Sequence, residues 1–134
     1  MPYELKLATR TRGLAAIVRV GGTLDLHGAP ELDREIDRLL GGDTREILVD
    51  LREVVFMDSL GLRSLVRAQQ LAQRAGVPLW VVRGGTPVAQ LLRMTGLDMT
   101  LPLIDELPRR LQGRRPLTVA QPAQRDMRIS SGNR

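Results

Sequence analysis

Apolar and polar residues alternate with two different periods along the first hundred residues of the chain. A period of two in residues 3–7 and a more continuously apolar run in residues 14–20 predict an edge strand and a more buried strand, joined by a turn. The pair Gly21-Gly22 is expected to end the second strand, because glycine weakens a strand interior. Residues 23–26 predict another short extended piece.

After Pro30 the spacing becomes that of a helix. One apolar stripe is formed by Leu32, Ile36, Leu39 and Leu40, with charged residues between them. Proline is typical of the first helical position, and the pair of glycines after the last leucine is typical of a helix end.

The same two periods continue through the rest of the first hundred residues. Residues 47–51 and 78–82 predict buried strands, and helices are predicted from Ser59 to Gly76 and from Thr86 to Gly96. Strands and helices therefore alternate, with short loops between them. This order predicts an α/β fold in which a partly parallel sheet is covered mainly by helices.

The net charge of +5 is unevenly distributed. Residues 1–106 carry 13 basic and 14 acidic side chains, whereas residues 107–134 carry seven arginines and one aspartate. The last segment also contains three prolines and few clustered apolar residues, which predicts a basic, disordered tail after a helical turn near residues 106–111. We therefore expect one domain in residues 1–106. Direct binding to nucleic acid is not expected, because no aromatic residues are interleaved with the arginines.

The chain contains no cysteine, which excludes disulfide and thiolate chemistry and favours a reducing compartment such as the cytoplasm. Its N-terminus lacks the basic patch and long apolar run of a signal peptide. No apolar segment reaches the roughly 20 residues that a membrane span needs. We therefore expect a cytoplasmic protein that makes no contact with a membrane.

The most informative segment leads from the strand at residues 47–51 into the following helix. An apolar run ends abruptly at Asp58-Ser59, and helical spacing begins immediately afterwards. A hydroxyl is thus placed beside a carboxylate at a helix start, where backbone N–H groups are unpaired and the helix dipole favours negative charge. Two interpretations follow: Ser59 is only an N-cap, or its hydroxyl is modified or recognised by a partner.

An enzyme is the competing class of protein. Ser59, His27 and one of several aspartates could form a hydrolase triad. The nucleophile elbow, however, requires Gly-x-Ser-x-Gly, and Met57 stands at the first glycine position. A domain of this size with one histidine also offers little room for a substrate pocket. We therefore expect no enzyme, no catalytic residue, no cofactor and no metal.

Three segments resemble motifs of one known family. They match the patterns G-x-L-D…A-P-x-L, F-x-D-S-x-G-L and T-G-L, and they are residues 22–32, 56–62 and 94–97. Their mutual spacing is similar to that of STAS domains, and within this family the likeness is greatest to bacterial anti-sigma factor antagonists. The resemblance covers roughly residues 3–106.

The resemblance implies the STAS fold, a small mixed sheet of four or five strands with about four helices. It also implies that Ser59, which follows the motif aspartate, accepts phosphate from a cognate anti-sigma factor that is itself a serine kinase. The unphosphorylated family member binds the anti-sigma factor and thereby releases the sigma factor. Phosphorylation ends this binding until a serine phosphatase reverses it.

Further residues near Ser59 are expected at the partner surface. The two acidic positions that the family has near its acceptor correspond to Asp25 and Asp58. Arg63 lies one helical turn after Ser59 and could partly neutralise a phosphate there. Leu60 stands where a common version of the motif has a second small hydroxyl residue, so the partner surface of this chain is expected to differ.

Three questions stay open at the level of the sequence. Asp25 could contact a partner, or it could only shape a turn. The chain could also be a non-switching STAS module, for instance the small docking subunit of a lipid-transport ATPase complex, which would bind its partner without phosphorylation of Ser59. The third open question is the oligomeric state of the protein.

Overall fold

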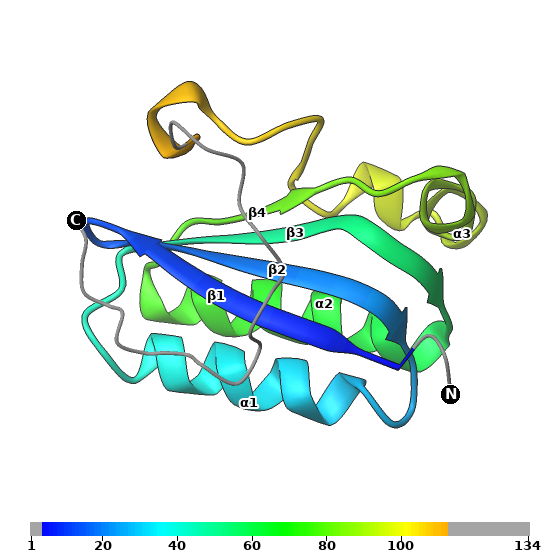
Figure 1. Cartoon of the computed structure of the whole chain (residues 1–134), viewed down its shortest axis with the longest axis horizontal. Coiled ribbons are helices and arrows are strands. Elements are labelled where there is room, and N and C mark those ends of the chain that lie inside the picture. Colours follow the sequence, from blue (N-terminus) through cyan, green and yellow to red (C-terminus); the bar gives the residue numbers. More distant parts are fainter. Residues whose placement is uncertain (1–3, 113–134) are drawn as a thin grey trace.

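A computed structural model describes residues 4–112 of the 134-residue chain. One five-stranded sheet forms its centre, and the strands lie in the order of the sequence (Figure 1). The first two strands are antiparallel, and every later strand is parallel to its neighbour. The predicted mixed α/β fold is therefore confirmed. The strands are β1 (Lys6–Arg12), β2 (Ala15–Leu24), β3 (Glu46–Met57), β4 (Leu79–Val82) and β5 (Leu103–Ile104).

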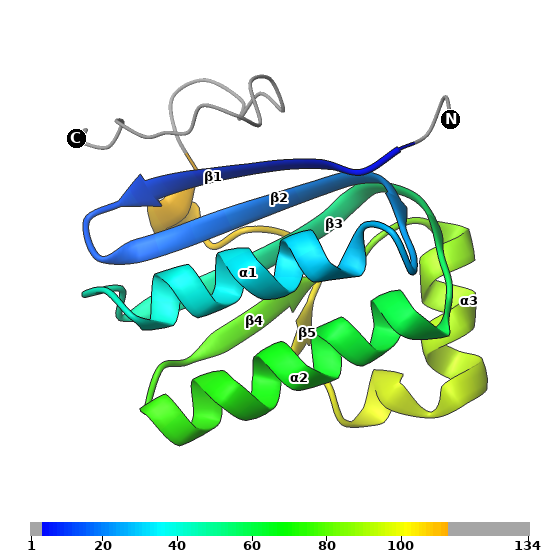
Figure 2. The same cartoon turned by 90° about the horizontal axis from the view of Figure 1, so that it is seen from below.

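Three α-helices and two short 3₁₀ helices complete the described part. Two of the α-helices lie side by side on one face of the sheet, and the third packs against β3 (Figures 1 and 2). Every helix in residues 4–112 is too short or too polar to cross a lipid bilayer. The helices are α1 (Ala29–Leu40), α2 (Ser59–Ala75), α3 (Thr86–Thr95), η1 (Leu97–Met99) and η2 (Arg109–Leu111).

The main core lies between the sheet and helices α1 and α2. Alternate residues of the central strands point toward these helices, as the period of two requires, and the apolar stripes of the helices meet them. Burying a large aliphatic side chain stabilises a fold by about 1.5–3 kcal/mol, so this layer fixes where the ends of α1 and α2 lie. The fully buried members include Val18, Val49, Val81, Leu32, Ile36 and Leu65.

Residues 107–112 pack against the opposite face of the sheet. Leu107 and Leu111 are buried there with Ile17 and Leu48 in a small apolar cluster. The packed part of the chain therefore continues beyond residue 106, because Leu107, just before η2, and Leu111 of η2 both meet an apolar patch on the sheet. The rest of that segment, residues 113–134, lies outside the described residues.

The strand boundaries differ from the sequence prediction in β1, β2 and β3. β3 runs from Glu46 to Met57, whereas residues 47–51 were the predicted strand. β1 begins at Lys6 and extends to Arg12, whereas residues 3–7 were the predicted strand. β2 continues through Gly21-Gly22 to Leu24, and the predicted break is wrong. The register against β3 shifts on both sides of the glycine pair, and Gly22 has a φ of 77°. The two glycines thus allow a bulged register within a continuous strand.

Candidate functional site

The candidate site lies where two neighbouring parallel strands end. Leu24 of β2 is in register with Met57 of β3, so Asp25 and Asp58 follow equivalent positions on adjacent strands. The Asp58 N–H donates a hydrogen bond of 3.3 Å to the Leu24 carbonyl. The structure therefore brings the turn before α1 and the start of α2 together at the carboxyl edge of the sheet, the usual place for sites in parallel sheets.

Gly61 permits this close approach. A Cβ atom added at Gly61 would lie 2.1 Å from the Leu24 carbonyl oxygen, which belongs to the backbone and cannot move away alone. The first turn of α2 therefore passes against the end of β2 only because residue 61 has no side chain. The glycine of the F-x-D-S-x-G-L pattern is a packing requirement here.

Asp58 is the N-cap of α2. Its carboxylate oxygen Oδ1 accepts hydrogen bonds from the Leu60 N–H at 2.9 Å and the Gly61 N–H at 3.1 Å. The interpretation of Ser59 as an N-cap is therefore wrong, because Asp58 takes that position and its carboxylate satisfies the donors. It also means that two of the N–H groups expected to be free at this helix start are already used.

Ser59 is the first residue of α2 and is exposed. Within residues 4–112, its hydroxyl makes no hydrogen bond to another side chain or to the backbone. The hydroxyl is therefore not required for the local structure, and it faces solvent beside the half-buried Asp58 and Leu60.

Asp25 shapes the turn between β2 and α1. Its Oδ1 accepts hydrogen bonds from the His27 N–H at 3.0 Å and the Gly28 N–H at 3.1 Å. Its backbone carbonyl accepts a further bond of 2.7 Å from the Ala29 N–H. The turn-shaping role that the sequence left open is thus present. His27 is exposed in this turn, and its side chain has no hydrogen bond to Ser59.

Exposed apolar side chains accompany the acidic residues at these strand ends. Leu26 is 59% exposed, Phe56 53% and Val55 47%. The register of β3 against β2 shifts between Gly22 and Thr23, so that Val55 has no partner residue in β2 at this bulge. None of these three residues was predicted as exposed, because the sequence pattern assigns neither the turn after β2 nor the run before Asp58 to a solvent-facing surface.

Arg63 and Arg67, two successive arginines of α2, differ in their ion pairs. Arg63 is exposed one turn after Ser59, and no ion pair joins it to another residue in the part of the chain that the structure describes. Arg67 instead forms ion pairs with two carboxylates of α1, at 3.5 Å to Asp33 and 3.0 Å to Asp37. Of these two cations, Arg63 is the one available to a group on Ser59.

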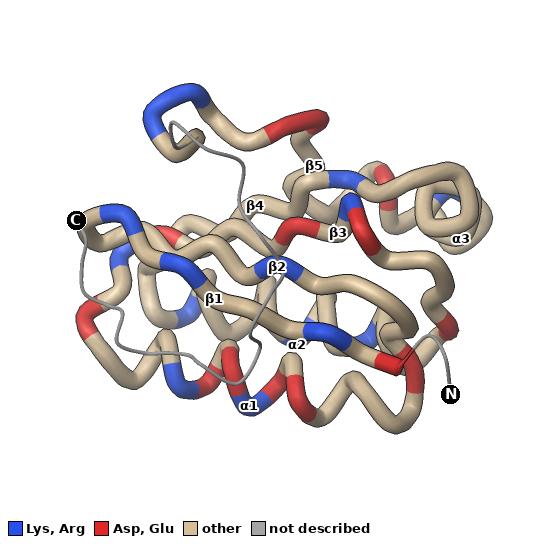
Figure 3. The backbone as a smooth tube through the Cα atoms, in the orientation of Figure 1, with Lys and Arg blue, Asp and Glu red and all other residues tan. Residues whose placement is uncertain are grey.

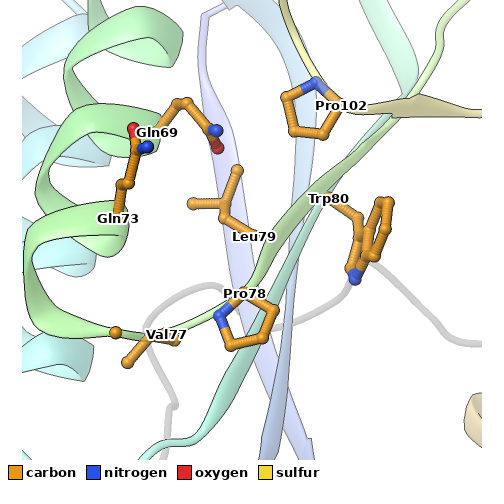
Figure 4. A pocket seen from close by; sticks show the side chains of 8 residues that line it. Gln69, Gln73, Val77, Pro78, Leu79, Trp80 and Pro102 are labelled. Atoms are coloured by element: carbon orange, nitrogen blue, oxygen red, sulfur yellow. The ribbon is translucent and has the colours of Figure 1, made fainter.

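A pocket lies at the opposite end of α2 from Ser59. It has a volume of about 400 Å³ and is lined by the end of α2 and the start of β4, with Trp80 and Pro102 on one side (Figure 4). None of its lining residues belongs to the candidate site. Residues 4–112 also contain no group of three or more His, Asp or Glu side chains that could hold a metal ion.

The chain belongs to the STAS domain family. The family model for the STAS domain matches residues 6–108, which include every strand and the whole candidate site. The family resemblance of the three sequence motifs is therefore confirmed.

Curated relatives and solved structures of anti-sigma factor antagonists are similar to this chain. An anti-sigma-B factor antagonist of Staphylococcus aureus is 31% identical over 94 residues, which are 70% of this chain and 87% of that protein. An anti-sigma-F factor antagonist of Mycobacterium tuberculosis is 29% identical over 112 residues, 84% of this chain and 91% of that protein. The crystal structure of an anti-sigma factor antagonist from Mycobacterium paratuberculosis has a TM-score of 0.69 and 25% identity, and it covers 80% of this chain and 91% of its own.

Proposed function

We propose that this protein is an anti-sigma factor antagonist whose binding is switched off by phosphorylation of Ser59. The unmodified protein binds a cognate anti-sigma factor, which is a serine kinase, and so releases a sigma factor in the cytoplasm. A serine phosphatase restores the unmodified form. The relatives named above support this class of function, since each is named for antagonism of a regulatory factor and none for a catalytic activity.

The observation that carries the proposal is the position of the Ser59 hydroxyl. It is exposed at the start of α2, and Asp58, not Ser59, makes the capping hydrogen bonds. A kinase can therefore modify Ser59 without breaking a contact that holds the fold. An exposed hydroxyl at the end of a rigid helix is also held in one place for a partner that recognises it.

Charge explains how the modification would end binding. A phosphate adds about −1.5 to −2 charges. Because the Asp58 carboxylate already occupies the Leu60 and Gly61 N–H groups, these donors cannot satisfy the new oxygens without displacing it. The phosphate therefore adds its charge at the surface between the turn of Asp25 and the cap of Asp58. A partner packed on the exposed Leu26 and Phe56 would then meet charge repulsion and a desolvation cost.

Arg63 is expected to moderate this effect. It lies one helical turn from Ser59, and opposite charges at that spacing attract modestly on a helix surface. Its guanidinium would orient the phosphate along α2, while most of the added charge stays exposed. The fold itself should be unchanged by the modification.

The first test compares wild-type protein and Ser59→Ala on a phosphate-affinity gel, which retards phosphorylated protein. Both proteins are taken from growing cells and from cells under several stresses. We expect a retarded species in the wild type that is absent from Ser59→Ala. If no condition produces a Ser59-dependent species, the switch is wrong, and a non-switching docking subunit becomes the better explanation.

The second test measures binding of purified protein to the co-expressed anti-sigma factor. Ser59→Ala should bind like the unmodified wild type, and Ser59→Asp should bind at least about tenfold more weakly because of its added charge. Gln70→Asp adds the same charge on an exposed position of α2 and serves as the matched control. Equal weakening by the two aspartates would show that net charge, not the site, controls binding.

A further inference from the structure

The start of β4 is an open stretch of sheet edge that the proposed function does not use. β5 pairs with β4 only from Val81 onward, so residues 78–80 have no strand beside them on that side within residues 4–112. The pocket of about 400 Å³ described above lies at this edge (Figure 4). We call this pocket the β4 groove; its lining includes Gln69, Gln73, Pro78, Leu79, Trp80 and Pro102.

The backbone of Leu79 faces the β4 groove. The Val81 N–H donates a hydrogen bond of 2.9 Å to the Pro102 carbonyl, on the side of β5. The Ile47 N–H donates one of 3.0 Å to the Pro78 carbonyl, on the side of β3. The N–H and C=O of one strand residue point to the same side, and successive residues alternate. The N–H and C=O of Leu79 therefore point to the side of β5, where the groove lies.

The ladder between β4 and β5 does not continue to Leu79. In a continued parallel ladder the Leu79 carbonyl would accept a bond from the N–H of residue 102, which Pro102 lacks. The Leu79 N–H would donate to Thr100, but Thr100 and Leu101 are held in a turn by their hydrogen bonds to the Leu97 carbonyl. Within residues 4–112, neither backbone group of Leu79 forms a hydrogen bond. The groove therefore contains one free donor and one free acceptor of a strand edge.

The two sides of the groove differ in chemistry. Leu79 faces the main core, so a residue paired with it would face α2, where Gln69 and Gln73 line the groove. The amides of these two glutamines form no hydrogen bond to a described residue. Trp80 is in register with Leu48 on the opposite face of the sheet and is 38% exposed. An occupant therefore fits best with a polar side chain toward α2 and apolar side chains toward the indole.

Charge and size restrict what can occupy the groove. No lining residue is charged, and neither is any residue of β4, whereas β1 at the other edge carries three cations (Figure 3). Because no cation is present to hold phosphates, a nucleic acid is disfavoured. The groove has eight lining residues, whereas a stable dimer interface takes about 20–30 from each partner. A short, uncharged peptide meets both limits.

We propose that the β4 groove binds a short, extended and uncharged segment of a partner protein, which pairs antiparallel with Leu79. One residue of the segment exchanges both backbone hydrogen bonds with Leu79 and turns its side chain toward Gln69 and Gln73. The residues on either side of it pack on Trp80 and Pro78. Their N–H groups point away from β4, so both positions accept proline, which packs well on aromatic rings. Docking here uses no residue of the candidate site and is independent of the proposed switch.

The first test titrates the full chain with the peptide acetyl-Val-Pro-Thr-Pro-Val-amide. Trp80 is the only tryptophan of the chain, so its emission reports the groove directly and should shift to shorter wavelength on binding. The control peptide has an N-methylated threonine, which cannot donate to the Leu79 carbonyl, and it should bind at least about fivefold more weakly. Salt should leave the affinity unchanged, because no charge takes part. Equal affinity of the two peptides, or the absence of binding, would overturn the proposal.

Pro102→Ala tests the same edge from the side of the protein. The new N–H can donate to the Leu79 carbonyl and lengthen β5, so the first peptide should bind at least about fivefold more weakly. Pro87→Ala, at the exposed start of α3 and outside the groove, is the matched control and should bind like the wild type. Unchanged binding in Pro102→Ala, or an equal loss in both variants, would overturn the pairing with Leu79.

A pair of glutamine variants tests the wall on α2. Gln73→Ala should weaken binding of the first peptide about threefold, because the amide no longer bonds to the threonine. Gln70→Ala, on the same helix and also exposed but outside the groove, should bind like the wild type. Equal affinities of these two variants would overturn the assigned direction of the central side chain.

Other occupants of the groove would give different results. An emission of Trp80 that shifts with protein concentration, without peptide, would show that a second copy enters the groove. Tighter peptide binding by a chain ending at residue 112 than by the full chain would show that residues 113–134 compete for it. Either result would overturn a partner segment as the occupant.

Discussion

At the scale of single residues, the candidate site depends on which polar atoms already form hydrogen bonds within the protein. Asp58 and Asp25 each use one carboxylate oxygen to accept two backbone N–H groups, and this fixes the two loops beside Ser59. The Ser59 hydroxyl forms no hydrogen bond in the described part of the chain. The three polar side chains of the sequence pattern therefore divide into two structural carboxylates and one available hydroxyl.

Gly61→Ala is expected to destabilise the protein by about 2–3 kcal/mol, because an added methyl group would overlap the Leu24 carbonyl oxygen. Urea unfolding followed by circular dichroism measures this change. Gly85→Ala is the control, since an added Cβ there has no heavy atom within 4 Å. Similar stabilities of the two variants would show that the close approach of α2 to β2 can relax at little cost.

At the scale of elements, the start of α2 can be tested through its cap. Asp58→Ala should cost about 1 kcal/mol in unfolding free energy, whereas Asp58→Asn should cost much less, because asparagine caps helices about as well as aspartate. Chemical denaturation of the three proteins makes this comparison. An equal loss in both variants would mean that the charge of Asp58, and not its hydrogen bonds, stabilises the helix.

The contact between η2 and β3 should make stability depend on pH. The hydrogen bond from Arg110 holds the pKa of the Glu46 carboxyl below its ordinary value. A carboxyl with a lowered folded-state pKa stabilises the fold above its unfolded pKa, and this is lost as pH falls through the folded pKa. Wild type should therefore be more stable than Arg110→Gln at neutral pH, and the difference should vanish in acid.

Thermal unfolding across this pH range gives the measurement, with Arg109→Gln as the control on the same short helix. Arg109 is exposed and is joined by no ion pair to a described residue. A difference between wild type and Arg110→Gln that persists in strong acid would assign the effect to packing of the arginine stem.

The long periodic elements were predictable from the sequence, and the short or irregular ones were not. α1, α2 and α3 follow apolar stripes that end at glycines, and β4 is a compact apolar run. β5 has only two residues and carries no recognisable period. The bulged course of β2 and β3 was also missed, because a bulge depends on the pairing of two strands and not on either strand alone.

The candidate site was also predictable only in part, because some of its features depend on how separate strands pair. The motif placed Asp25, Asp58 and Ser59 at loops, and the register of β2 with β3 brings those loops together. The exposure of Leu26 and Phe56 depends on the turn after β2 and on the pairing of β3 with β2, which no period in the sequence reports. The burial of Leu107 and Leu111 depends on an apolar patch on the far face of the sheet, to which β2, β3, β4 and β5 contribute.

At the scale of the whole molecule, the boundary of the packed domain can be tested by truncation. A chain ending at residue 112 should unfold like the full protein, whereas a chain ending at residue 106 loses two buried leucines. The shorter chain should be less stable by on the order of 2–4 kcal/mol. Denaturation of both truncations measures this difference. Equal stability of the two would show that residues 107–112 add nothing to the core.

The order of the strands has a consequence for how the protein is made. Each strand pairs with the strand that follows it in the chain, so the sheet can grow in the direction of synthesis. When α2 has left the ribosome, β1, β2, β3, α1 and both acidic loops are already present. The hydroxyl of Ser59 therefore belongs to the part of the protein that can assemble first, before β4 and β5 extend the sheet.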